Sequence, residues 1–77
     1  MPQIEVSLFA MLRKYVDGAA SVEVQIEPGW TVADVLKQLG VPADQTRILF
    51  VDNRAAKLTD PLSGGEHLAV FPGIAGG

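Results

Sequence analysis

Two segments near the start of the chain alternate strictly between apolar and polar side chains. In residues 3–9 and again in residues 22–27 the even positions are apolar, and polar residues stand between them. A period of two residues is the pattern of a strand with one buried face. The two segments therefore predict strands that bury one side of a sheet and leave its other side to solvent or partners.

One helix is marked at both of its ends. Thr31 is a suitable N-cap, and Asp34 follows three residues later as its capping-box partner. Gly40 is a typical C-terminal stop. Between these signals the apolar residues recur at helical spacing. We expect a helix over residues 32–39 whose buried stripe is Val32, Val35, Leu36 and Leu39.

Three more strands complete the predicted order. They cover residues 47–52, a weaker stretch near 55–58, and a last strand that ends at Phe71. The order predicts an α+β fold, a mixed sheet of four to five strands with one main helix packed on one face. The residues expected beneath the helix are Ile4, Val6, Leu8, Val22, Val24, Ile26, Ile48, Phe50, Leu68 and Val70.

Composition excludes several classes of function. The formal charge is -3 and the six basic residues are scattered, which disfavours nucleic-acid binding. The chain has no cysteine, hence no disulfide and no thiolate. No apolar run approaches the roughly 20 residues of a membrane helix, and no signal-peptide pattern is present, so we expect a cytoplasmic protein. A chain of 77 residues also has little volume for an enclosed catalytic pocket.

The end of the chain differs from the rest. Residues 72–77 contain a proline, three glycines and no charged side chain. We expect a domain over residues 1–71 and a flexible tail over 72–77, which can extend about 20 Å. Consecutive glycines can pass a narrow channel, and the terminus supplies a carboxylate. The alternative is an ordinary frayed C-terminus.

Aromatic residues are predicted on the sheet face opposite the helix. There Phe9, Ala69 and Phe71 would form an exposed apolar patch next to the tail. We interpret it as a docking surface, the alternatives being incidental exposure or cover by residues 10–20. Arg13 is either a contact for an acidic partner or phosphate, or a solvated side chain. The single histidine, His67, is interpreted as sheet surface, without a catalytic or metal role.

Taken together, these segments resemble the ubiquitin-like β-grasp sulfur carriers of the MoaD/ThiS family. Within it they are most similar to the small subunit of molybdopterin synthase, MoaD, because of the Phe-Ala-x-Leu-Arg segment and the Phe-Pro tail. The resemblance covers nearly the whole chain. The matching segments are residues 8–13, 31–36, 60–62 and 71–77.

The resemblance implies a carrier that is not itself an enzyme. Its Gly77 carboxylate would be adenylated by an activating enzyme of the MoeB/ThiF type and then converted to a thiocarboxylate by a persulfide donor. The tail residues Gly73, Ile74, Ala75 and Gly76 would thread into the partner's active site. ATP would be used by the activating enzyme, so the resemblance implies no cofactor, metal or catalytic residue for this chain.

The resemblance leaves the sulfur acceptor open. The main expectation is a large subunit of molybdopterin synthase, MoaE-like, that builds the dithiolene of molybdopterin. The alternatives are a ThiS-like carrier for thiamine, cysteine or tRNA thiolation, and a ubiquitin-like modifier that forms isopeptide bonds with lysines. A plain β-grasp interaction module with an inert tail is a further alternative.

Overall fold

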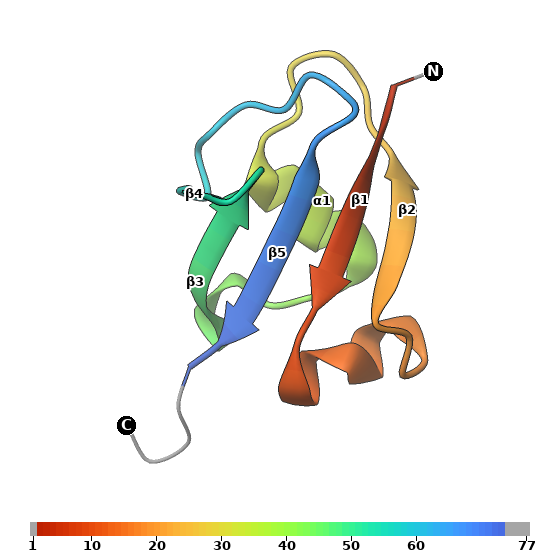
Figure 1. Ribbon diagram of the computed structural model, residues 1–77, viewed down its shortest axis with the longest axis vertical. Helices are drawn as coiled ribbons and strands as arrows, with labels where there is room; N and C mark the ends of the chain where they lie inside the picture. Colours follow the sequence, from red (N-terminus) through yellow and green to blue (C-terminus); the bar gives the residue numbers. More distant parts are fainter. Residues whose placement is uncertain (1, 74–77) are drawn as a thin grey trace.

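The structure, a computed structural model, describes residues 2–73 and contains one sheet and one α-helix (Figure 1). None of the helices within that range has the length and apolar character needed to cross a membrane. The elements in chain order are β1 (Gln3–Leu8), the 3-10 helix η1 (Ala10–Val16), β2 (Ser21–Gln25), α1 (Val32–Leu39), the 3-10 helix η2 (Ala43–Gln45), β3 (Thr46–Val51), β4 (Arg54–Ala55) and β5 (His67–Pro72).

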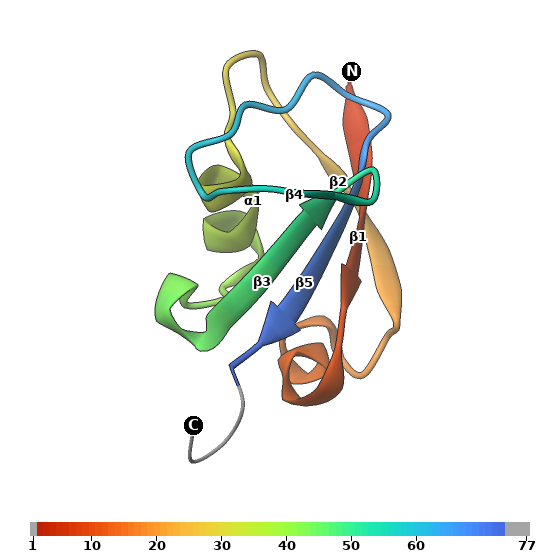
Figure 2. The ribbon, with the colours of Figure 1, turned by 60° about the vertical axis from the view of Figure 1, so that its left-hand side comes forward.

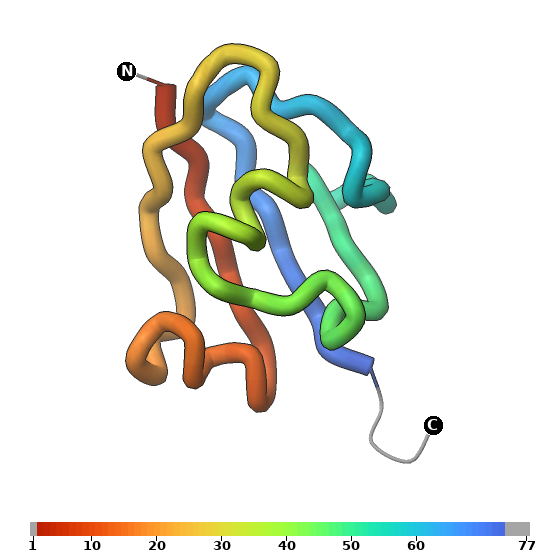
Figure 3. Tube along the Cα trace, turned by 180° about the vertical axis from the view of Figure 1, so that it is seen from behind, coloured from red at the N-terminus to blue at the C-terminus, as the bar shows by residue number. Residues whose placement is uncertain are grey.

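The sheet is mixed, with the strand order β2-β1-β5-β3-β4. The central strand β5 runs parallel to β1, and the other pairs are antiparallel. Helix α1 lies on one side of the sheet only (Figure 2) and crosses it when seen from behind (Figure 3). The fold is therefore the expected ubiquitin-like β-grasp. We call the sheet face opposite α1 the outer face.

Helix α1 has the bounds that the sequence predicts. The backbone N–H of Thr31 donates to Oδ2 of Asp34 over 2.8 Å, and the Thr31 hydroxyl donates to the same oxygen over 3.2 Å. At the other end Gly40 has a φ of 80°, a left-handed conformation that glycine adopts without strain. Both signals lie next to the helix in the sequence, so its bounds could be predicted without knowledge of the fold.

The buried core lies between α1 and the sheet. It includes the inward-facing residues of β1 and β5 together with Val32, Val35 and Leu36 of the helix, all of them nearly inaccessible to solvent. Leu39, the fourth residue of the predicted stripe, is only partly buried. Leu12, from η1, is fully buried and closes the core beside β5. The buried hydrophobic residues are Ile4, Val6, Leu8, Leu12, Val24, Ile26, Val32, Val35, Leu36, Val41, Leu49, Leu62, Leu68 and Val70.

Strand β3 faces the other way from the prediction. Ile48 is 49% exposed and Phe50 is half-buried, whereas Leu49 is 7% exposed and belongs to the core. Pairing with β5 is irregular between Thr46 and Ile48 and then continues with Leu49 opposite Val70. The prediction that Ile48 and Phe50 lie under the helix was therefore wrong. Val22, also expected there, is only partly buried.

The corrected orientation of β3 predicts losses of stability of different size for two neighbouring aliphatic residues. Leu49→Ala should lower the free energy of unfolding by about 2 kcal/mol, because it leaves a cavity in the core. Ile48→Ala should cost less than about 1 kcal/mol, because half of that side chain already contacts water. Urea denaturation of both variants measures the difference. A larger loss of stability for Ile48→Ala than for Leu49→Ala would support the original prediction that Ile48 lies under the helix.

Strand ends differ slightly from expectation. Strand β5 includes Pro72, one residue beyond the predicted boundary, and the Gly73 N–H donates to the Gln45 carbonyl over 3.4 Å. Strand β4 is limited to two residues, because the Lys57 N–H donates to Oδ2 of Asp60 over 3.0 Å and turns the chain away. The last strand thus includes the first residue of the predicted tail, Pro72.

Candidate partner-binding surface

The tail begins where the central strand β5 leaves the sheet. Gly73 is exposed, and a Cβ built on it would meet no atom within 4 Å. The predicted reactive residue Gly77 lies outside the described residues, as do Ile74, Ala75 and Gly76. What the structure does describe is the surface from which the tail departs.

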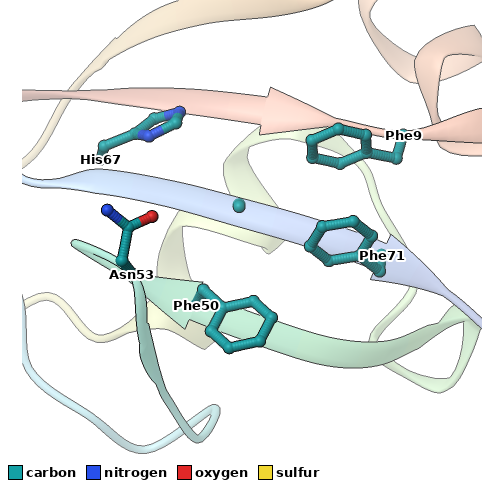
Figure 4. A pocket seen from close by; sticks show the side chains of 6 residues that line it. Phe9, Phe50, Asn53, His67 and Phe71 are labelled. Atoms are coloured by element: carbon teal, nitrogen blue, oxygen red, sulfur yellow. The ribbon is translucent and has the colours of Figure 1, made fainter.

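Three phenylalanine rings gather on the outer face next to this point (Figure 4). The rings of Phe9 and Phe71 are stacked, with centroids 4.2 Å apart and planes 6° from parallel. The ring of Phe50 meets Phe71 edge-on at 5.9 Å and 88°. Both geometries are favourable for aromatic pairs. The three side chains are half-buried, so the cluster is ordered by its own contacts and still open on one side.

Strand register brings the three rings together. Leu8 lies beside Val70 in the parallel pair, so the next residues, Phe9 and Phe71, are neighbours. The Phe9 N–H donates to the Val70 carbonyl over 3.3 Å and holds the chain there before η1 begins. Across the antiparallel pair, Phe50 lies opposite Ala69, whose small side chain leaves room between the rings.

The rings line one end of a depression of about 320 Å³ on the outer face. We call it the aromatic groove; its lining residues are Phe9, Phe50, Asn53, His67, Ala69 and Phe71. Asn53 and His67 form its other end (Figure 4). His67 Nε2 lies 2.6 Å from the Ser7 hydroxyl oxygen, and the His67 N–H donates to Oδ1 of Asp52 over 3.0 Å. The groove is therefore apolar beside the tail and polar at the far end.

The sequence predicted part of this surface. The structure brings together Phe9, Ala69 and Phe71, as expected, and it adds Phe50 and Asn53, which were not among the candidates. Arg13 is exposed and does not line the groove, and its Nε donates to the Leu8 carbonyl over 3.1 Å. That bond gives Arg13 a structural role at the end of β1, while its contact with a partner stays a prediction.

Phe50 was missed because the charged residues of its strand do not favour either face as the exposed one. In residues 47–52 each of the two possible faces carries one charged residue, Arg47 on one and Asp52 on the other. Alternation therefore does not choose between Leu49 and Phe50 as the buried residue. Asn53 was read only as turn chemistry. The pairing of Phe50 with Ala69 places Phe50 on the outer face, and that pairing is not visible in the sequence.

The surface has the chemistry of a binding site. Within residues 2–73, no three His, Cys, Asp or Glu side chains are grouped so as to hold a metal ion. What the groove offers is a partly exposed aromatic lining, and aromatic side chains of this kind are enriched at protein interfaces. The arrangement is that of a surface able to bind another protein.

Comparison with protein families gives one match. The family model described as the ThiS family matches residues 6–77, which is nearly the entire chain and includes the tail. A comparison with curated proteins gives no match.

Solved structures with the same fold include small archaeal modifier protein 1 of Haloferax volcanii. It is 27% identical with a TM-score of 0.78, and the match covers 96% of this chain and 100% of that chain. A putative molybdopterin converting factor subunit 1 of Pyrococcus furiosus is 19% identical, with a TM-score of 0.77 and coverage of 96% and 100%. A chain of the Amycolatopsis orientalis BexX/CysO complex is 24% identical, with a TM-score of 0.66 and coverage of 96% and 99%. The last two show the fold alone.

Proposed function

Because the chain belongs to the ThiS family of small, non-catalytic carrier proteins, we propose that it carries sulfur as a thiocarboxylate on its C-terminal residue, Gly77. The observation that carries the proposal is the extent of the family match, which runs through the Gly76-Gly77 end of the chain. The fold supports it, since the tail leaves the sheet directly beside an open aromatic surface.

The proposed chemistry begins at a carboxylate, which is a poor electrophile. A Gly77 carboxylate oxygen attacks the α-phosphorus of ATP and pyrophosphate leaves, giving an acyl-adenylate that nucleophiles attack readily. The outer sulfur of a persulfide then attacks the acyl carbon, a C–S bond forms and AMP leaves, giving an acyl disulfide with the donor. A thiol attacks the donor's sulfur in that S–S bond and forms a disulfide with it, so that the outer sulfur stays on Gly77 as the thiocarboxylate. The adenylating enzyme supplies these steps, while the carrier contributes reach and recognition.

In this proposal the aromatic groove binds the partner, and the tail carries the reactive carboxylate. The groove binds the partner through Phe9, Ala69 and Phe71, together with Phe50, and Arg13 contacts it at the edge. Gly73, Ile74, Ala75 and Gly76 then pass into the partner's active site, because glycine backbones fit narrow channels. We propose that the chain consists of a β-grasp domain over residues 1–71, which partners recognise, and a reactive tail over residues 72–77.

The sulfur acceptor is a narrower question. The Phe-Ala-x-Leu-Arg and Phe-Pro segments favour a large subunit of molybdopterin synthase, which would make the protein a cytoplasmic MoaD-like carrier. The similar solved structure with a molybdopterin-related name is 19% identical and supports the fold only. We therefore propose thiocarboxylate formation at Gly77 as the function. Molybdopterin synthesis is one proposed use of the sulfur, beside the synthesis of thiamine or cysteine and tRNA thiolation.

A second candidate is protein modification. It is favoured by the match to small archaeal modifier protein 1, which is more similar in sequence to this chain than the molybdopterin converting factor is. A modifier and a carrier share the adenylation step and differ in what attacks the acyl carbon: a lysine amine or a persulfide.

One incubation distinguishes the two candidates. The chain is mixed with its source organism's adenylating enzyme and ATP, with either a persulfide donor or a lysine-rich acceptor protein. A carrier gains the mass of one sulfur in place of one oxygen. A modifier forms covalent adducts with the acceptor. If neither product forms while the enzyme stays active on another carrier, the proposed function is wrong.

A further inference from the structure

The outer face carries an unusual charge arrangement next to the aromatic groove. Glu5 and Glu23 lie directly opposite each other on β1 and β2, and both are exposed. Side chains in this position have Cβ atoms about 5 Å apart, and like charges there destabilise a sheet. The Gln3 side-chain amide donates to Oε2 of Glu23 over 3.4 Å, which adds no opposite charge.

This acidic pair is continuous with the groove. In the parallel pairing Glu5 lies beside His67, which lines the polar end of the groove. Glu23, Glu5 and His67 therefore follow one another across three adjacent strands of the outer face. The surface thus has two parts, an aromatic part beside the tail and an acidic part at the far side.

We propose that the outer face binds a partner protein that inserts one apolar side chain among Phe9, Phe50 and Phe71 and places lysine or arginine side chains over Glu5 and Glu23. The groove supplies the apolar site, and the acidic pair determines the charge of the partner. A cation over the pair would remove the repulsion between the two carboxylates. The bound state therefore relieves a cost that the free chain carries.

The same charges argue against a second copy of this chain as the occupant. The chain has a formal charge of -3. Two outer faces packed against each other would bring further carboxylates into the interface without a compensating basic group from β1 or β2. Like charges brought together in an interface are strongly unfavourable. A basic surface on a different protein is the chemistry that fits.

The test uses the double variant Glu5→Gln, Glu23→Gln, which keeps the shape and removes both charges. The proposal rests on the carrier function, because the probe is the adenylating enzyme. We expect association with that enzyme to slow about tenfold at low ionic strength, and the difference from wild type to shrink in salt. The melting temperature should stay the same or rise, because a repulsion has been removed. A purely structural role would not lower binding while raising stability.

The control removes the same total charge elsewhere. Asp17→Asn, Asp44→Asn changes two exposed acids that belong to no strand, and it should leave the association rate within twofold of wild type. Equal rates for the wild type and the Glu5→Gln, Glu23→Gln variant would overturn the proposal. Sedimentation velocity gives a second test. If the wild-type chain forms a dimer and the Phe50→Ala variant is a monomer, the proposal is also overturned, because the occupant of the outer face is then a second copy.

Failure of the carrier function gives a different result. If the wild-type chain is never adenylated, the surface is tested with a phage library of random twelve-residue peptides selected on the intact chain. The inference expects enriched peptides that combine an apolar residue with flanking lysine or arginine, and it expects the Glu5→Gln, Glu23→Gln variant to lose them. Enrichment of acidic or uncharged peptides, or no enrichment, would contradict it.

Discussion

Deleting Gly77 is expected to reduce sulfur loading at least about a hundredfold while leaving the domain folded. The deletion leaves a carboxylate on Gly76, but it shortens the reach of the tail by about 3.3–3.6 Å. A misplacement of about 1 Å already costs about a hundredfold when a reaction depends on positioning. Stability should not change, because the terminal residues of a chain contribute little to folding, and the core of the part that the structure describes runs from Ile4 to Val70.

The control for this deletion is Gln38→Ala, at an exposed position of α1. It lies outside both the tail and the aromatic groove, and it leaves the length of the chain unchanged. We expect loading within threefold of wild type. Thiocarboxylate formation by the two variants is followed by intact mass spectrometry, and their melting temperatures by circular dichroism. Undiminished loading of the truncated chain would show that the terminal position is not the reactive one.

Phe71→Ala is expected to weaken binding to the adenylating enzyme about a hundredfold, which corresponds to about 3 kcal/mol. Phe71 contacts both other rings of the aromatic groove, so its removal also releases Phe9 and Phe50 from their stacked and edge-on positions. The stability cost should be smaller, about 1 kcal/mol, because the side chain lies on the outer face and is only half-buried.

The control for Phe71 is an aromatic residue on the core side. Trp30 packs against the buried core. Trp30→Ala should therefore lower the melting temperature by several degrees, at about 4–8 °C for each kcal/mol, and leave the affinity unchanged. Titration calorimetry and thermal denaturation of both variants separate the two roles. A large loss of stability with unchanged affinity in Phe71→Ala would place Phe71 in the core instead.

The parts of the fold that could be predicted are those with local signals. Helix α1 has its cap residues Thr31 and Gly40 next to it in sequence, and β1 and β2 have polar residues at every outward position. The expected connection after Asp52 is also present. Asp52 and Asn53 both adopt left-handed φ angles, 52° and 67°, as a tight hairpin requires.

The parts that could not be predicted depend on contacts between distant segments. The orientation of β3 follows from its pairing with β5 and from the irregularity between Thr46 and Ile48. For that reason Phe50, which completes the aromatic groove, was assigned to the core. The acidic pair could not be predicted for the same reason, since Glu5 and Glu23 become neighbours only through the register of β1 and β2.

The central claim is that the sulfur is attached to the last residue. Its most direct test is tandem mass spectrometry of the chain after incubation with the adenylating enzyme, ATP and a persulfide donor. Trypsin cuts last after Lys57, so residues 58–77 form a single peptide. We expect the exchange of one oxygen for one sulfur on the fragment that contains only Gly77. An unchanged terminal fragment, with an enzyme that loads another carrier under the same conditions, would contradict the account.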